Sequence, residues 1–162
     1  MKIKLQIHHL SFIIRKSRGF TLIELLVVIG IMGILSSFLL ANFIGVRQRA
    51  RDGVRKSDLR QIQSALELYR SDKGSYPTSG SGSGNFPTTC GSQFDDGAAT
   101  PVVYMKKIPC DPSSGSPYTY SLSGNSYSLV TCLENTNDSQ LDTPKANCSG
   151  STTLWKYTLQ NP

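Results

Sequence analysis

The chain of 162 residues has only two histidines, His8 and His9, and both precede a long apolar run that begins at Phe20. If the segment before Phe20 is removed, the remaining protein contains no imidazole. Ser-His and Cys-His catalysis and metal sites built on histidine are then excluded. The chain also lacks a Gly-rich phosphate loop, since the Ser-Gly repeat at 81–84 is typical of a linker. These absences argue against an enzyme.

Charged residues are scarce, at 17% of the chain, and they are unevenly distributed. Five of the 17 bases precede Phe20, so the rest of the chain carries 12 bases against 11 acids. The net charge of +6 therefore comes from the first residues and does not indicate nucleic acid as a partner. The bases that follow the apolar run also lack the interleaved aromatic side chains of a surface that binds single strands.

Residues 20–46 form an apolar run of 27 residues with one acid, Glu24, no base and no proline. About 20 apolar residues cross a bilayer, so the run predicts a transmembrane helix. The alternative is a secretory signal peptide, whose apolar core is shorter and ends in a small-x-small site. Ala41 is the best small residue here, but Leu39 lies two positions before it. Five bases precede the run and six follow it closely, so positive charge does not decide the orientation.

Glu24 is the only charge of this run, and a carboxylate at the centre of a bilayer costs about 2.5–3.5 kcal/mol, less near an end. One interpretation places Glu24 at the membrane interface, where water solvates it. In the other, cleavage after Gly19 creates an ammonium group on Phe20, four residues before Glu24 on the same helical face. The amine and the carboxylate would then neutralise each other, within one chain or between neighbouring chains.

The cysteines are widely spaced and include no Cys-x-x-Cys pair. They are Cys90, Cys110, Cys132 and Cys148. An even set of this kind favours disulfides in an oxidising compartment over a zinc site, and four free thiols in a cytosolic domain are the alternative. Of the three pairings, Cys90–Cys110 with Cys132–Cys148 is preferred because each bond closes a short local loop.

Residues 47–73 are expected to continue as an amphipathic helix that ends at Lys73-Gly74. Its apolar stripe has spacings of three to five and consists of Val54, Leu59, Ile62, Leu66 and Tyr69. Its bases, Arg55 among them, are expected on the solvated faces.

The last part of the chain is expected to form a small sheet against this helix. Residues 78–100 are predicted to be a loop. Side chains of two kinds, large and small, alternate along residues 118–122 and 126–130, and Gly124-Asn125 between them is a turn signal, so a hairpin is predicted. Residues 154–159 predict a third strand.

The sequence around Gly19 resembles the class III signal of type IV pilins and pseudopilins. It reads Arg-Lys-Ser-Arg-Gly at 15–19 and Phe-Thr-Leu-Ile-Glu at 20–24, followed by the unbroken apolar run. The resemblance implies that a prepilin peptidase cuts between Gly19 and Phe20 and N-methylates Phe20, and that Glu24 guides assembly into a filament. It also implies a single-pass protein of the cytoplasmic (inner) membrane with its leader in the cytoplasm and its head outside.

A second stretch is similar to the major, G-type pseudopilin of type II secretion. It includes Ala-Leu-Glu-Leu-Tyr at 65–69, Asp-Lys-Gly-Ser-Tyr-Pro at 72–77 and Tyr-Met-Lys-Lys-Ile-Pro at 104–109. The expected fold is α+β and type IV pilin-like, a long N-terminal helix packed on a small antiparallel head. The resemblance implies four parts: a cleaved leader at 1–19, a transmembrane helix at 20–46, an amphipathic helix at 47–73 and a loop-rich β head at 74–162.

The G-type resemblance also implies a calcium site in the loop after the hairpin, with Glu134, Asn137 and Asp138 as ligands. Oxygen-rich side chains suit calcium. An ordinary polar loop is the alternative, and the four cysteines could take over the role of fastening the loop.

We therefore predict a structural filament subunit of a type II protein secretion system rather than an enzyme. It would assemble with other pseudopilins into a short pilus-like fibre at an assembly platform in the membrane. A type IV pilus or DNA-uptake pilin is the alternative, and a membrane-anchored exported enzyme or binding protein is the third reading.

Overall fold

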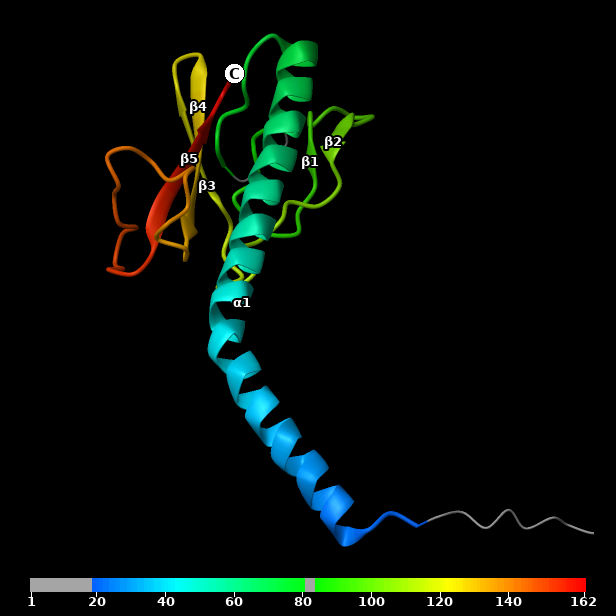
Figure 1. Ribbon diagram of the computed structural model, residues 1–162. Coiled ribbons are helices and arrows are strands. Elements are labelled where there is room, and N and C mark those ends of the chain that lie inside the picture. Colours follow the sequence, from blue (N-terminus) through cyan, green and yellow to red (C-terminus); the bar gives the residue numbers. More distant parts are fainter. Residues whose placement is uncertain (1–18, 81–83) are drawn as a thin grey trace, which may run out of the picture. The chain divides into compact units, whose positions relative to one another are not determined.

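The computed structural model describes residues 19–80 and 84–162 (Figure 1). The expected leader, except for Gly19, lies outside the described residues. The chain divides into two units, Met1–Ala41 and Asn42–Pro162. Within the described residues the elements are, in order, α1 (Leu22–Lys73), β1 (Phe94–Asp95), β2 (Val103–Met105), β3 (Thr119–Ser123), β4 (Ser126–Leu133) and β5 (Trp155–Gln160).

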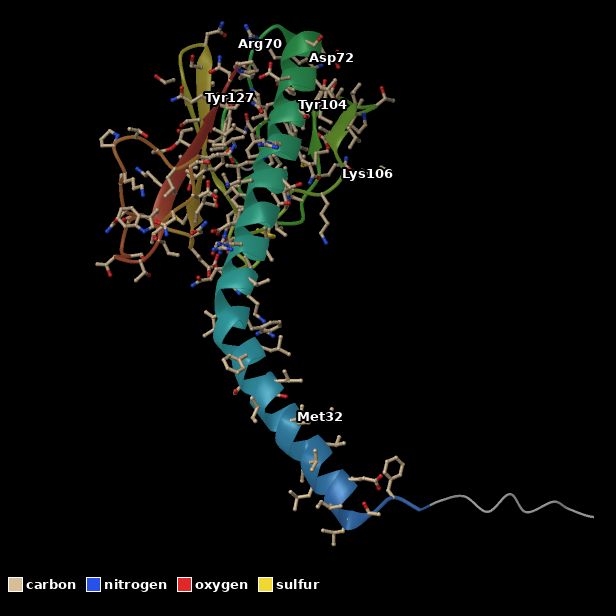
Figure 2. The ribbon with its side chains drawn as sticks, viewed as in Figure 1. Met32, Arg70, Asp72, Tyr104, Lys106 and Tyr127 are labelled. Atoms are coloured by element: carbon tan, nitrogen blue, oxygen red, sulfur yellow. A yellow bond between two sulfur atoms is a disulfide. The ribbon has the colours of Figure 1, made fainter. Side chains whose placement is uncertain are left out.

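The described part of the first unit is dominated by apolar helix. Its segment Leu22–Leu39 is long and apolar enough to cross a membrane, and none of it is buried within the chain. Met32, labelled in Figure 2, projects from the ribbon with 62% of its surface exposed. A helix that is apolar on all sides needs lipid or other helices around it. The segment therefore fits membrane anchoring.

In the second unit, one face of α1 forms the centre of the hydrophobic core. Its fully buried side chains are Leu59, Ile62 and Leu66. Val54 is 47% exposed, so the prediction that it belongs to this stripe is wrong. Asp52 and Arg55, each 2% exposed, continue the buried face instead, because residues three and seven positions apart share one side of a helix.

The end of α1 agrees with the sequence. The helix ends at Lys73, and the Gly74 amide donates a hydrogen bond to the Arg70 carbonyl at 2.8 Å. Gly74 has a φ of +79°, a left-handed conformation that glycine adopts without steric penalty. The predicted helix end is confirmed.

A three-stranded antiparallel sheet has the order β3-β4-β5. Ser123 pairs with Ser126, so Gly124-Asn125 forms the turn between β3 and β4, and Leu129 of β4 lies opposite Leu159 of β5. The predicted hairpin and third strand are both confirmed.

A second, two-stranded sheet interrupts the expected loop at 78–100. Phe94 of β1 pairs with Met105 of β2 and is fully buried. A strand of two residues is too short to show the alternation by which strands are recognised. Figures 1 and 2 show the two sheets on opposite sides of the C-terminal half of α1, with Tyr127 on one side and Tyr104 on the other.

The core joins both sheets to the helix. It contains Leu59, Ile62 and Leu66 of α1 together with Phe94, Ile108, Tyr120, Tyr127 and Leu129 from the head. Several aromatic rings are in contact, with centroids 4.8 Å apart for Phe86 and Tyr120. The expected α+β fold, a long N-terminal helix with small antiparallel sheets, is confirmed.

Candidate functional site

The residues of the expected processing and assembly site lie just before α1 and in its first turn. Gly19 and Phe20 are exposed and precede the helix. Thr21 is the residue before the first helical residue, and Glu24 folds back toward it. The amide nitrogen and Oγ1 of Thr21 each donate to Glu24 Oε2 at 2.8 Å, and the Glu24 amide donates to Thr21 Oγ1 at 3.3 Å.

This reciprocal arrangement is a capping box, in which a hydroxyl residue and an acid three positions later satisfy each other's backbone amides. A negative charge is also favourable at this end of the helix dipole. Thr21 is a residue of this site that was not predicted. The Thr-x-x-Glu spacing at 21–24, directly before an apolar run, is the signal that would have found it.

The Glu24 carboxylate lies beside apolar side chains. Phe20, Ile23, Val27 and Val28 line a shallow concavity of about 320 Å³ together with Glu24. Phe20 itself is 87% exposed. A carboxylate in apolar surroundings is tolerated when it is hydrogen-bonded, and here both of its donors come from Thr21.

A second group of charged residues lies where the head meets α1, and we call it the docking cluster. It consists of Arg51, Asp52, Arg55, Asp111 and Glu134. Arg55 is its centre: Nη1 donates to Asp52 Oδ1 at 2.7 Å and to Glu134 Oε1 at 2.9 Å, and Nε donates to Asp111 Oδ2 at 2.6 Å. One buried guanidinium thus joins three carboxylates, two of them from the head. The prediction of a solvated face is wrong for Arg55.

The remaining contacts of the docking cluster fix the end of β4. Asp52 accepts hydrogen bonds from the backbone amides of Glu134, at 3.0 Å, and Asn135, at 2.8 Å. Arg51 Nε donates to Glu134 Oε1 at 2.8 Å and makes a second contact through Nη2. The helix therefore holds this part of the head through both side-chain and backbone groups.

The docking cluster lowers the pKa of its head carboxylates. The hydrogen bond from Arg51 is the main reason that the pKa of Glu134 falls to about 2, although burial opposes it. Burial also raises the pKa of Asp111, but hydrogen bonds from Arg55 and from two backbone amides outweigh it and bring that pKa to about 2. Burial lowers the pKa of Arg55, but its hydrogen bonds to Asp111, Glu134 and Asp52 outweigh this effect and raise that pKa. All three groups are charged at neutral pH.

Two of the expected calcium ligands have other partners. Glu134 belongs to the docking cluster and Asp138 forms an ion pair with Lys56. For Asn137, the backbone amide donates to Asn135 Oδ1 at 3.2 Å. Within residues 19–80 and 84–162, no group of three or more His, Cys, Asp or Glu side chains is placed to hold a metal ion. Calcium binding stays a prediction from the family resemblance.

Two disulfides lie next to the docking cluster in the sequence. They join Cys90 to Cys110 and Cys132 to Cys148, the pairing preferred above. Cys110 directly precedes Asp111, and Cys132 lies two residues before Glu134. Each head carboxylate that contacts Arg55 is therefore close to a covalent cross-link.

Two family models match the chain. The first, "Prokaryotic N-terminal methylation motif", matches residues 14–40. The second, "Type II secretion system (T2SS), protein G", matches residues 42–148.

Curated relatives agree with the second match. The chain is 37% identical over 109 residues to "Type II secretion system core protein G" of Aeromonas hydrophila, covering 64% of this chain and 72% of the relative. It is 32% identical over 121 residues to the protein of the same name in Escherichia coli strain K12, covering 71% of this chain and 72% of the relative. It is 34% identical over 110 residues to the Vibrio cholerae protein of that name, covering 65% of this chain and 71% of the relative. No solved structure gives a significant match.

Proposed function

The chain belongs to the type II secretion system protein G family and is a pseudopilin subunit, and we propose that it is processed after Gly19 and assembled through Glu24 into a pilus-like fibre. The observation that carries the proposal is the first turn of α1. There the methylation motif, the capped Glu24 and the start of an exposed apolar helix coincide. The proposed role is structural rather than catalytic.

Processing would occur at the bond between Gly19 and Phe20. Both residues precede the first helical residue and are exposed, which supports access by a peptidase. Cleavage would remove residues 1–19 and leave Phe20 as the N-methylated first residue. The mature chain would then consist of a transmembrane helix at 20–46, an amphipathic helix at 47–73 and a head at 74–162.

The head would lie on the extracytoplasmic side of the cytoplasmic membrane. Two disulfides support this orientation, because such bonds persist in oxidising compartments. Three bases that follow the apolar run, Arg51, Arg55 and Lys56, form ion pairs with head carboxylates. Their charges are therefore compensated by head carboxylates. These bases then give little reason, under the positive-inside rule, to place this end of the span in the cytoplasm.

Assembly would depend on the Glu24 carboxylate. In the unprocessed chain it accepts hydrogen bonds from Thr21. Cleavage would add an ammonium group on Phe20, and Glu24 would pair with that group in its own chain or in a neighbour as subunits pack. Other pseudopilins, a prepilin peptidase and an assembly platform in the membrane would be the partners, and an ATPase on another polypeptide would supply the work.

The processing step is tested by the N-terminal residue and intact mass of the protein from cells with the native processing machinery. We expect an N-methylated Phe20 and a mass that corresponds to residues 20–162. A chain that begins at Met1, or one cut near Ala41, would contradict the proposal and favour an anchored or secreted protein.

The assembly step is tested with Glu24→Ala. We expect this variant to reach the membrane fraction in normal amounts and to yield few or no fibres. Glu24→Gln is the matched control, since it keeps an oxygen that can accept from Thr21 but removes the charge. If Glu24→Ala assembled like the parent, the role of Glu24 would be refuted; if Glu24→Gln alone assembled, the cap rather than the charge would be responsible.

A further inference from the structure

Of the six bases that closely follow the apolar run, three form no ion pair with any described residue. They are Arg47, Arg49 and Arg60, and all three are exposed. The acids nearest to them in the sequence are already engaged: Asp52 with Arg55 and two backbone amides, and Asp58 with the Tyr118 hydroxyl. The head therefore leaves these three charges without compensation.

Arg47 and Arg49 occupy a particular position on α1. They follow apolar side chains that are themselves exposed: Phe43 at 50%, Ile44 at 69% and Val46 at 57%. The Arg47 guanidinium carbon lies 4.4 Å from the centroid of the Phe43 ring. Long basic side chains that extend from an apolar surface and keep their charge in water are typical of the membrane–water interface.

The arrangement of the two arginines around the helix distinguishes between partners. At 1.5 Å per residue they are about 3 Å apart along the axis, but at 3.6 residues per turn they lie roughly 200° apart around it. A protein partner that docks on one face of the helix would meet only one of them. A layer that surrounds the helix at one depth would meet both.

We propose that Arg47 and Arg49 form a collar that binds the phosphates of anionic phospholipids where α1 leaves the membrane. The proposal rests on the membrane anchoring described above. The headgroup layer is about 5–8 Å thick on each side of the bilayer, so it accommodates both arginines. Arg60 lies about 20 Å farther along the helix than Arg47 and falls outside it.

The chemistry of arginine suits this role. Its guanidinium is charged at all relevant pH values and binds phosphate oxygens through two parallel hydrogen bonds. Bases on the exported side of a membrane span are disfavoured by the positive-inside rule. In this chain the docking cluster and the Lys56–Asp138 ion pair compensate three such bases, and lipid phosphates would compensate the two in the collar. The collar would set the depth at which the subunit sits before assembly.

The test uses the full processed chain reconstituted in phosphatidylcholine vesicles that contain spin-labelled phosphatidylglycerol or spin-labelled phosphatidylcholine. The fraction of motionally restricted label gives the preference of the protein for the anionic lipid. We expect the preference to fall about fivefold for each arginine replaced in Arg47→Gln and Arg49→Gln. Arg60→Gln, with the same charge change, should match the parent, and the double lysine variant should keep most of the preference.

Three results would overturn the proposal: an unchanged preference in the double glutamine variant, an equal loss in Arg60→Gln, or a parental preference that survives 1 M salt, where surface charges are screened within about 3 Å. If the double variant loses fibre assembly in cells but keeps the lipid preference, the arginines contact another subunit and the collar is also refuted. The N-terminal mass of the parent, measured on the same preparation, reports separately on the proposed processing.

Discussion

In the first unit the apolar side chains of Leu22–Leu39 are all at the surface, and the only acid, Glu24, is hydrogen-bonded to a residue three positions away. In the second unit Leu59, Ile62 and Leu66 of α1 are fully buried, and Arg55 binds carboxylates 56 and 79 residues away. The described residues of the first unit satisfy the charge of Glu24 locally and leave their apolar surface to other molecules. The second unit buries the apolar stripe of its helix and pairs Arg55 within itself.

This difference predicts that the second unit determines the stability of the fold, whereas the first unit determines membrane insertion and assembly. The free energy of unfolding of the head should depend on long-range contacts of the second unit, since each fully buried Leu or Ile contributes about 1.5–3 kcal/mol. The described segment Leu22–Leu39 buries none of its surface within the chain, so changes there should act on membrane insertion and fibre formation. Four variants or conditions test this separation, in order of decreasing effect.

The largest effect is expected for Arg55→Met. It leaves Asp52, Asp111 and Glu134 without their central cation, and removing one partner of a buried ion pair costs about 3–5 kcal/mol. The midpoint of denaturant unfolding of the full chain in detergent, followed by Trp155 fluorescence, should fall accordingly. Arg60→Met, at an exposed position, should stay within about 0.5 kcal/mol of the parent. A normal midpoint for Arg55→Met would show that the docking cluster does not stabilise the head.

The next effect is expected from replacing Cys132 and Cys148 together by serine. The two residues are 16 positions apart, and opening a loop of that length costs about 3 kcal/mol in the chain-entropy estimate. The thermal midpoint of the head should fall, while the amount of protein in the membrane should not change. Reduction of the parent opens both disulfides, so it should lower the midpoint at least as far. A variant as stable as the parent would mean that the docking cluster alone fastens this loop.

Acidification should destabilise the head through Glu134. Its pKa in the folded protein is about 2, below the ordinary value, so its contribution to stability is complete above about pH 5 and is lost as the pH falls through about 4 to 2. The loss should be on the order of 2 kcal/mol. Glu134→Gln should be less stable at pH 7 and show a shallower fall. Equal slopes for parent and variant would contradict the assignment of the pKa shift to this ion pair.

The smallest effect is expected for Thr21→Val, and it should be confined to the first unit. Loss of a helix N-cap costs about 1 kcal/mol, so the amides of the first turn of α1 should exchange with solvent about fivefold faster. The unfolding midpoint reported by Trp155 should not move, and Thr21→Ser should behave like the parent. A shift of the head midpoint in Thr21→Val would break the proposed separation of the two units.

Several features could be predicted from local sequence because their physical causes are local. The apolar run, the end of α1 at Gly74 and the turn at Gly124-Asn125 each depend on neighbouring residues or on a period of 3.6 or 2. The capping box at Thr21 and Glu24 is equally local, because its signal is the Thr-x-x-Glu spacing directly before the apolar run. The family resemblance also rested on contiguous motifs.

Other features depend on contacts between residues far apart in the sequence, which local patterns do not reveal. An apolar pattern assigns Val54 to the buried face and Arg55 to solvent, but the structure reverses both because Asp111 and Glu134 come to α1 from the head. Glu134 would bind calcium or arginine through the same carboxylate oxygens, so its partner depends on which groups the fold brings close to it. A sequence states which charges a chain carries, and packing determines which of them meet.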